Sequence, residues 1–90
     1  MKNWGMRISK SILKDLGEVE RNYLLKIKNT INNLALNPFP ENAKKLKGKD
    51  KLILRIRVGV YRIVYLVDLK QRLVVILGIN HRKSSYRKNF

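Results

Sequence analysis

The stretch LILRIRVGVYRIVYLVD, residues 52–68, decides the fold and carries the most informative charges of the chain. Its β-branched and aromatic residues predict two strands, at about 52–57 and 60–67, joined by a turn at Val58-Gly59. Charges on a sheet are costly unless water or an opposite charge meets them. The hairpin nevertheless contains three arginines, which are Arg55, Arg57 and Arg62. We therefore expect one face of this hairpin to bind an anion.

The alternation of side chains along a strand predicts which face that is. Leu54 and Ile56 point to one side of the first strand, and Arg55 and Arg57 point to the other. A loop of two or four residues places Arg62 opposite Arg55, whereas an odd loop would turn it toward the core. We prefer the even loop, because it keeps charge out of the core. Like charges that face each other destabilise a sheet. We therefore interpret this face as a phosphate-binding surface; the alternative is that the guanidinium groups extend into water from a sheet edge.

The remaining residues predict an α+β fold in the order β-α-α-β-β-β. A short strand at 6–8 precedes a helix that Ser9 or Ser11 caps and Gly17 ends. A second helix at about 18–36 carries the apolar stripe Val19, Tyr23, Ile27, Ile31, Leu34 and Ala35. Residues 38–51 are interpreted as a polar, lysine-rich connection, and 73–80 as the last strand. The expected architecture is an N-terminal helical hairpin packed on one face of a mainly antiparallel sheet.

Composition limits the function classes. The 90 residues predict one domain, 1–90, and 21 Lys and Arg against 6 Asp and Glu give a net charge of +15. Such an excess predicts a polyanionic partner, most commonly nucleic acid, although an acidic protein or an anionic membrane surface would also fit. The absence of cysteine excludes disulfides, and one histidine with six scattered carboxylates makes a metal site unexpected. No secretory signal or membrane-spanning run is visible, so we expect a cytoplasmic protein without a cofactor.

Four groups of residues, taken in order, carry a resemblance to a known family. They are Asn37-Pro38, Ala43-Lys44-Lys45-Leu46-Lys47-Gly48, the hairpin residues 54–65, and Asn80-His81-Arg82-Lys83 with Tyr86. In this order the chain resembles the RelE/ParE superfamily, and more closely the RelE-like toxins of type II toxin–antitoxin pairs, whose fold is microbial-RNase-like. The resemblance implies a ribosome-dependent endoribonuclease, an mRNA interferase that cuts translated mRNA by metal-independent attack of the 2′-OH. It also implies three partners: a RelB-like antitoxin, the ribosome and mRNA.

The resemblance also implies roles for individual residues. Arg55 matches a basic residue at the scissile region, Arg62 and Arg82 match arginines that hold phosphate, and Tyr86 matches a tyrosine that stacks on a base. His81 or Tyr86 is expected to move a proton. Well-studied members carry a further lysine at the position of Ile53. The residue that acts as the general base is therefore not assigned. Lys51 or a lysine of the 38–51 connection could take the place of the missing lysine. The expected RNA-binding residues are Lys47, Lys49, Lys51, Arg57 and Lys83.

Plainer interpretations stay open for several of these residues. His81 could be an ordinary surface histidine, Tyr86 could pack the chain end onto the sheet, and Arg57 could face water or the antitoxin. Two alternative functions also remain, a ParE-like poison of DNA gyrase and a non-catalytic or decayed RNA-binding homologue.

Overall fold

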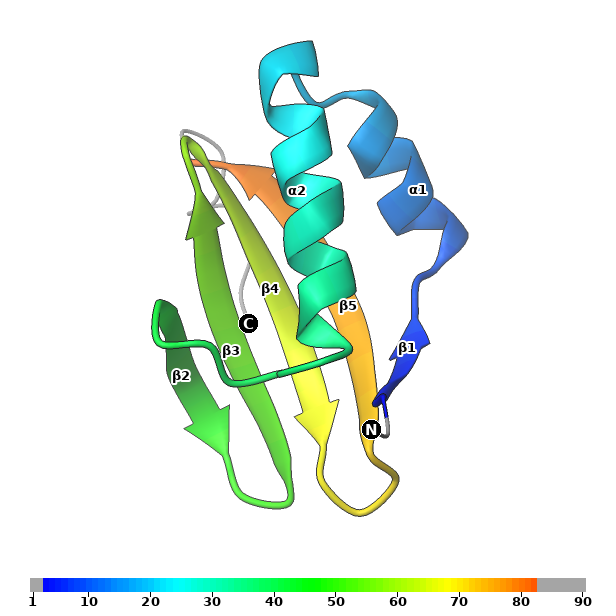
Figure 1. Ribbon diagram of the computed structural model, residues 1–90, viewed down its shortest axis with the longest axis vertical. Helices are drawn as coiled ribbons and strands as arrows, with labels where there is room; N and C mark the ends of the chain where they lie inside the picture. The colour runs from blue at the N-terminus through cyan, green and yellow to red at the C-terminus, as the bar shows by residue number, and fades with distance from the viewer. Residues whose placement is uncertain (1–2, 83–90) are drawn as a thin grey trace.

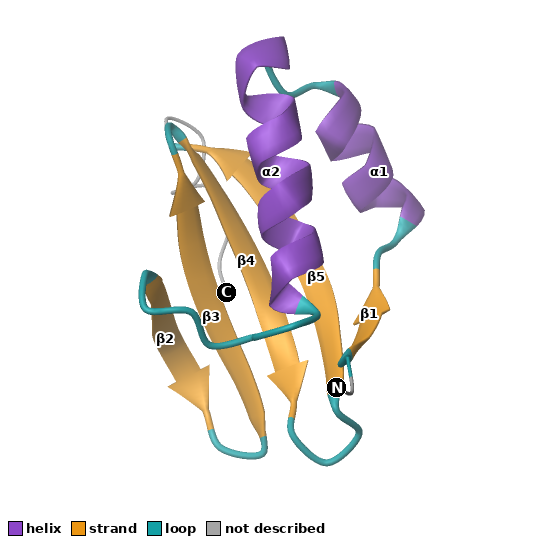
Figure 2. Cartoon of the chain, viewed as in Figure 1, coloured by secondary structure: helices purple, strands orange, loops and turns teal. Residues whose placement is uncertain are grey.

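The computed structural model describes residues 3–82 and contains five strands and two helices. Figure 1 shows both helices on one face of a single sheet, and Figure 2 shows the same two layers coloured by secondary structure. In chain order the elements are β1 (Gly5–Arg7), α1 (Lys10–Gly17), α2 (Arg21–Leu34), β2 (Ala43–Gly48), β3 (Lys51–Val58), β4 (Tyr61–Asp68) and β5 (Leu73–His81). The α+β architecture expected from the sequence is confirmed.

The sheet has the strand order β1-β5-β4-β3-β2. β1 pairs with β5 in parallel, and the other three pairings are antiparallel. The sheet is therefore a meander of four strands, with the N-terminal strand added at one edge and β2 at the other (Figure 1). This arrangement places the β3–β4 hairpin in the interior of the sheet.

The expected connection at 38–51 is wrong in one respect, because its centre forms the edge strand β2. Five of the six residues of β2 are exposed, and its two apolar side chains, Ala43 and Leu46, do not alternate with polar ones. Lysines on an edge strand also discourage pairing with other chains. A lysine-rich edge strand therefore looks like a loop in the sequence.

α1 begins at its predicted position. Of the two candidate caps for α1, the structure uses Ser9, whose Oγ accepts a hydrogen bond from the Ile12 N–H at 3.4 Å. α2 is shorter than expected at both ends. The backbone N–H of Glu20, just before α2, donates to the hydroxyl of Tyr61 at 3.2 Å, which ties the start of this helix to β4.

The core lies between the helices and the side chains of the sheet that face them. Ile27, Ile31 and Leu34 of α2 are buried, as the predicted stripe requires. They share one apolar cluster with buried sheet residues that include Leu54, Ile56, Ile63, Tyr65, Val67, Val74 and Ile76. The Tyr65 hydroxyl donates to the Pro38 carbonyl oxygen at 2.8 Å, which anchors the connection after α2.

Neither helix within residues 3–82 has the length and apolar character that crossing a membrane requires.

Candidate nucleic-acid interface

Three arginines lie on the sheet face opposite the helices. Leu54 and Ile56 of β3 are buried on the helix side, so Arg55 and Arg57 point the other way. Arg57 is the register partner of Arg62 on β4, which puts all three arginines on one face. We call Arg55, Arg57 and Arg62 the arginine face. The even loop length predicted from the sequence is confirmed.

The predicted pairing partner of Arg62 is wrong by two residues. Arg62 faces Arg57, and Arg55 faces Val64. The turn consists of Gly59 and Val60, one residue later than expected, because Gly59 adopts a φ of +60°. Tight hairpin turns need a residue with positive φ at the first loop position, and glycine supplies it without steric cost. The position of Gly59 therefore determines where the turn forms, and the position of the turn determines which residues of β3 and β4 pair.

Within residues 3–82, no acidic side chain neutralises the charges of the arginine face. Among residues 3–82, Arg55, Arg57 and Arg62 form no ion pair; the ion pair that this region contains joins Lys70 to Asp50 at 3.6 Å, and both of its side chains are exposed. Partial burial lowers the pKa of Arg55 from its ordinary value, and the positive charges of Arg57 and Arg62 lower this pKa further. These three side chains therefore repel one another, and an anion that binds there would relieve the repulsion.

The Nε atom of Arg62 is buried and has no hydrogen-bond partner among the described residues. A buried donor without a partner is costly, and guanidinium groups bind phosphate oxygens through paired N–H donors. Arg57, Arg62 and Arg82 also line one small cavity of about 60 Å³ beside the hairpin turn, together with Gly59, Val60 and Tyr61. The backbone N–H of Arg82 donates to the Val60 carbonyl oxygen at 2.7 Å and holds the end of β5 against the turn. We call these residues the arginine cavity.

A bulge in β5 decides which residues near its end share the arginine face. The pairing shifts between Val64–Gly78 and Tyr65–Ile76, so Leu77 is the extra residue. As a result Asn80 pairs with Arg62 and His81 pairs with Tyr61. Asn80 is 6% exposed and was not among the site residues expected from the sequence. A bulge leaves no clear sequence signal, so only the resemblance motif that contains Asn80 pointed to this position.

His81 lies with the aromatic side chains on the helix side of the sheet. Its ring meets the Tyr61 ring edge-on, with centroids 5.2 Å apart, and Tyr61 in turn contacts Tyr23 of α2 at 5.5 Å. The register thus separates His81 from the side of the sheet that Arg62 occupies. The structure brings Arg62 and Arg82 together and does not group His81 with them; the proton-transfer role of His81 stays a prediction.

Three of the four expected RNA-binding lysines, Lys47, Lys49 and Lys51, lie toward β2 and the β2–β3 turn. Lys47 of β2 is the register partner of Ile53, and Lys49 lies in the turn, where it is exposed. Lys51 begins β3 and pairs with Asp68, at the far end of the hairpin from the arginine cavity. Tyr86 and Lys83 lie outside the described residues. The general base, which the sequence left open because position 53 carries an isoleucine, stays open among the described residues.

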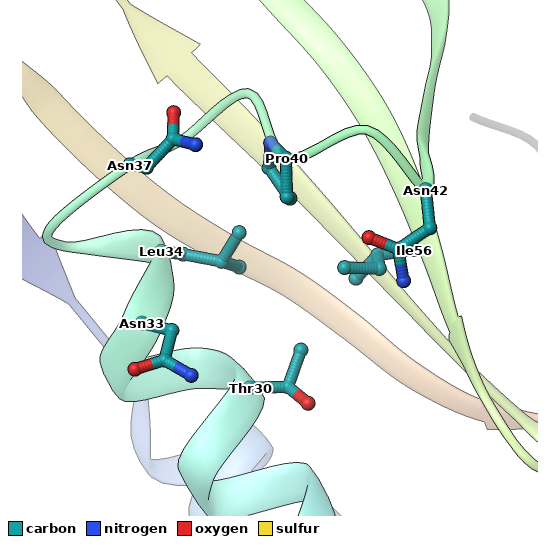
Figure 3. Close-up of a pocket in the computed structure, with 7 residues that line it drawn as sticks. All are labelled: Thr30, Asn33, Leu34, Asn37, Pro40, Asn42 and Ile56. Carbon is teal, nitrogen blue, oxygen red and sulfur yellow. The ribbon is translucent and has the colours of Figure 1, made fainter.

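A second cavity lies on the helix side of the sheet, between the end of α2 and β3. It measures about 280 Å³, and Figure 3 shows the residues that line it: Thr30, Asn33, Leu34, Asn37, Pro40, Asn42 and Ile56. Two of its polar side chains already serve the local backbone. The Thr30 hydroxyl donates to the Lys26 carbonyl oxygen, and the Asn37 side-chain oxygen accepts from the Phe39 N–H. None of its lining residues is basic, which distinguishes it from the arginine cavity.

Comparisons with known proteins agree with this geometry. A family model described as the ParE toxin of the type II toxin–antitoxin system parDE matches residues 6–86. RelE1 of Methanocaldococcus jannaschii is 34% identical over 87 residues, which cover 93% of this chain and 96% of that protein.

Two solved toxin–antitoxin complexes contain similar chains. The archaeal RelE–RelB complex from Pyrococcus horikoshii matches with a TM-score of 0.82 and 26% identity, over 89% of this chain and 96% of that one. The RelB–RelE complex from Methanococcus jannaschii matches with a TM-score of 0.71 and 27% identity, over 93% and 99%. The chain therefore belongs to the ParE toxin family of type II toxin–antitoxin systems, and its relatives identify it as a RelE-like toxin.

Proposed function

We propose that this toxin is a ribosome-dependent endoribonuclease that cleaves mRNA during translation. The observation that carries the proposal is the arginine cavity, where Arg57, Arg62 and Arg82 from three separate segments line one hollow. The buried Nε of Arg62, which has no hydrogen-bond partner within residues 3–82, supports it further, because a phosphate oxygen would supply an acceptor.

The chemistry that we propose is transfer within the RNA backbone. The 2′-oxygen of one nucleotide attacks the adjacent phosphorus, the P–O5′ bond breaks, and the products are a 2′,3′-cyclic phosphate and a 5′-hydroxyl. The 2′-OH loses its proton and the departing 5′-oxygen gains one. Negative charge grows on the phosphate oxygens in the transition state, and cationic donors that are already in place stabilise it.

Each arginine has a distinct part in this proposal. Arg62 and Arg82 hold the scissile phosphate. Arg55 lies on the same face of the sheet, two residues from Arg57 along β3, and stabilises the transition state. Guanidinium groups keep their protons at neutral pH, so these residues act as electrostatic clamps and not as proton carriers. Tyr86 or His81 transfers the proton in this scheme, and the edge-on packing of His81 against Tyr61 makes Tyr86 the first of the two to test.

A RelB-like antitoxin is the protein partner that we propose. The chains that it resembles in Pyrococcus horikoshii and Methanococcus jannaschii were solved as complexes with RelB. The net charge of +15 fits a partner with an acidic segment, since complementary charge accelerates and orients association. Co-expression with the gene encoded beside it should yield a stable complex and relieve growth arrest.

The test of the proposed function is induction of the toxin alone in cells, followed by mapping of mRNA 5′ ends. Wild-type toxin should produce new ends within translated codons, and Arg62→Ala/Arg82→Ala should produce none. New ends that persist in the double variant would contradict the arginine assignment.

Poisoning of DNA gyrase is the second candidate, because the matching family model is named for ParE. It predicts replication arrest and DNA breaks upon induction, with mRNA left intact. The same induction experiment separates the two candidates when DNA and mRNA are examined side by side.

A further inference from the structure

The lysines of β2 are divided between the two faces of the sheet by a bulge. Lys44 pairs with Arg55, Lys45 with Leu54 and Lys47 with Ile53, so Leu46 is the extra residue. In a regular strand Leu46 would share the face of Lys44, and Lys47 would lie on the other side. The bulge therefore places Lys47 on the arginine face, opposite Ile53.

The cations of the two strand pairs form rows across the sheet. One row contains Arg57 and Arg62, and the next contains Lys44 and Arg55. Lys47 and Ile53 begin the third row, which lies farther from the Gly59-Val60 turn between β3 and β4. Neighbouring strands are about 4.8 Å apart, and alternate residues on one strand are about 6.8 Å apart. The cations thus continue from the arginine cavity toward the β2 edge at a spacing that suits successive phosphates of an extended nucleic acid.

We infer that β2 completes the RNA-binding surface, with Lys44 and Lys47 holding backbone phosphates of single-stranded mRNA next to the phosphate bound at the arginine cavity. This inference rests on the proposed function and adds the path of the substrate to it. Lys44 faces Arg55 directly, an arrangement of like charges that destabilises the sheet until an anion lies between them. All six Asp and Glu residues lie within the described residues, and no ion pair joins any of them to Lys44 or Lys47.

Lys47 also accounts for the apolar residue at position 53. Cross-strand partners have Cβ atoms about 5 Å apart, and a lysine side chain is longer than that. A cation from β2 can therefore serve the part of the arginine face where β3 itself carries Ile53. In this role Lys47 binds and positions the RNA, and no proton transfer is assigned to it.

The test compares two double variants that remove the same charge. Lys44→Gln/Lys47→Gln removes two lysines from the arginine face. Lys28→Gln/Lys45→Gln removes one lysine from α2 and one from the other face of β2, and all four residues are exposed. The probe is a short fluorescent RNA with 2′-O-methyl groups, which the toxin cannot cleave by 2′-OH attack. Affinity is measured over a range of salt concentrations for both variants and for the wild type, after matching thermal unfolding curves confirm that the fold is intact.

Each phosphate contact with single-stranded nucleic acid contributes about 0.7 to the slope of log affinity against log salt. Lys44→Gln/Lys47→Gln should therefore lower the slope by about 1.4, and the control pair should change it much less. On ribosomes programmed with mRNA, the first pair should raise the half-saturating concentration about tenfold and leave the maximal cleavage rate within about twofold, because the lost contacts lie beside the scissile phosphate.

Equal slopes of log affinity against log salt for the two double variants would overturn the inference. The net charge of the protein, and not the position of Lys44 and Lys47, would then explain RNA binding. It would also be overturned if Lys44→Gln/Lys47→Gln weakened only the complex with the proposed antitoxin. A wild-type toxin that cleaves nothing on the ribosome would refute the proposed function instead, and the RNA slopes would still decide whether β2 binds RNA.

Discussion

The two faces of the β3–β4 hairpin differ in chemical character, although their residues alternate along the same strands. On the helix side Leu54, Ile56, Ile63 and Tyr65 are buried in one apolar cluster. On the other side Arg57 faces Arg62, and Lys44 faces Arg55 across the next strand pair. The first face stabilises the fold by burying apolar side chains. The second face contains pairs of like charges that repel each other and destabilise the sheet. The difference fits a division in which the helix side maintains the structure and the arginine face, as we propose, binds an anionic partner.

Adjacent residues of β4 should separate these two roles most clearly. Ile63 is completely buried, so Ile63→Ala should lower the free energy of unfolding by about 2–5 kcal/mol through lost burial and a residual cavity. Its neighbour Arg62 points to the arginine face, and Arg62→Ala should change stability by less than about 1 kcal/mol. Urea denaturation of both variants measures the difference. Equal destabilisation would mean that Arg62 maintains the fold and would weaken the contrast between the faces.

The turn that sets the register should be the next most sensitive position. Gly59 has a φ of +60°, and a Cβ atom there would overlap the ring of Tyr23 on α2. Gly59→Ala should therefore cost about 1–2 kcal/mol for the backbone alone, with a further loss from displacement of Tyr23. Gly17→Ala is the matched control, because a Cβ atom there meets no other atom within 4 Å. Thermal unfolding should show a clear decrease for Gly59→Ala and none for Gly17→Ala; similar melting temperatures would remove the explanation of the register.

Tyr65 links the core to the connection after α2, and this link should depend on pH. Burial raises the pKa of Tyr65 to about 12 from an ordinary value of 10.0. The folded state therefore keeps a proton that the unfolded chain loses, so this contribution is complete below pH 10 and is lost as the pH rises to about 12. Tyr65→Phe removes the hydrogen bond to Pro38, which should cost about 1 kcal/mol at neutral pH. Stability measured between pH 8 and 12 should fall less steeply in this variant, and an unchanged slope would assign the alkaline loss to other groups.

The smallest expected effect has the opposite sign. Arg57 is exposed and directly faces Arg62, so Arg57→Gln should relieve repulsion and stabilise the fold by about 0.2–1 kcal/mol. The same change should weaken RNA binding, because Arg57 lines the arginine cavity. Paired measurements of melting temperature and RNA affinity check both signs. A variant that is less stable would show that the arginines support the sheet and do not strain it.

The sequence allowed the faces to be predicted better than the pairing. Alternation and the cost of burying charge were enough to place Arg55, Arg57 and Arg62 together. The exact partner of Arg62 depended on where the chain could adopt a positive φ, and Gly59 moved the turn by one residue. The edge strand β2 lacked any apolar alternation and could not be distinguished from a loop.

The two bulges explain most of what else could not be predicted. Leu77 reverses the alternation near the end of β5, so that Asn80 and not His81 shares the face of Arg62. Leu46 does the same in β2 and brings Lys47 to the arginine face. Such insertions depend on how neighbouring strands fit together, and composition or periodicity along one strand carries little information about them.

The most direct test of the central claim is single-turnover cleavage of mRNA bound to purified ribosomes. The account predicts that wild-type toxin cuts the message and leaves a 2′,3′-cyclic phosphate, and that Arg62→Ala slows the cut by about 10²–10³-fold without loss of folding, since one clamp on the developing charge is removed. A wild-type rate that Arg62→Ala retains, or intact mRNA with both proteins, would contradict it.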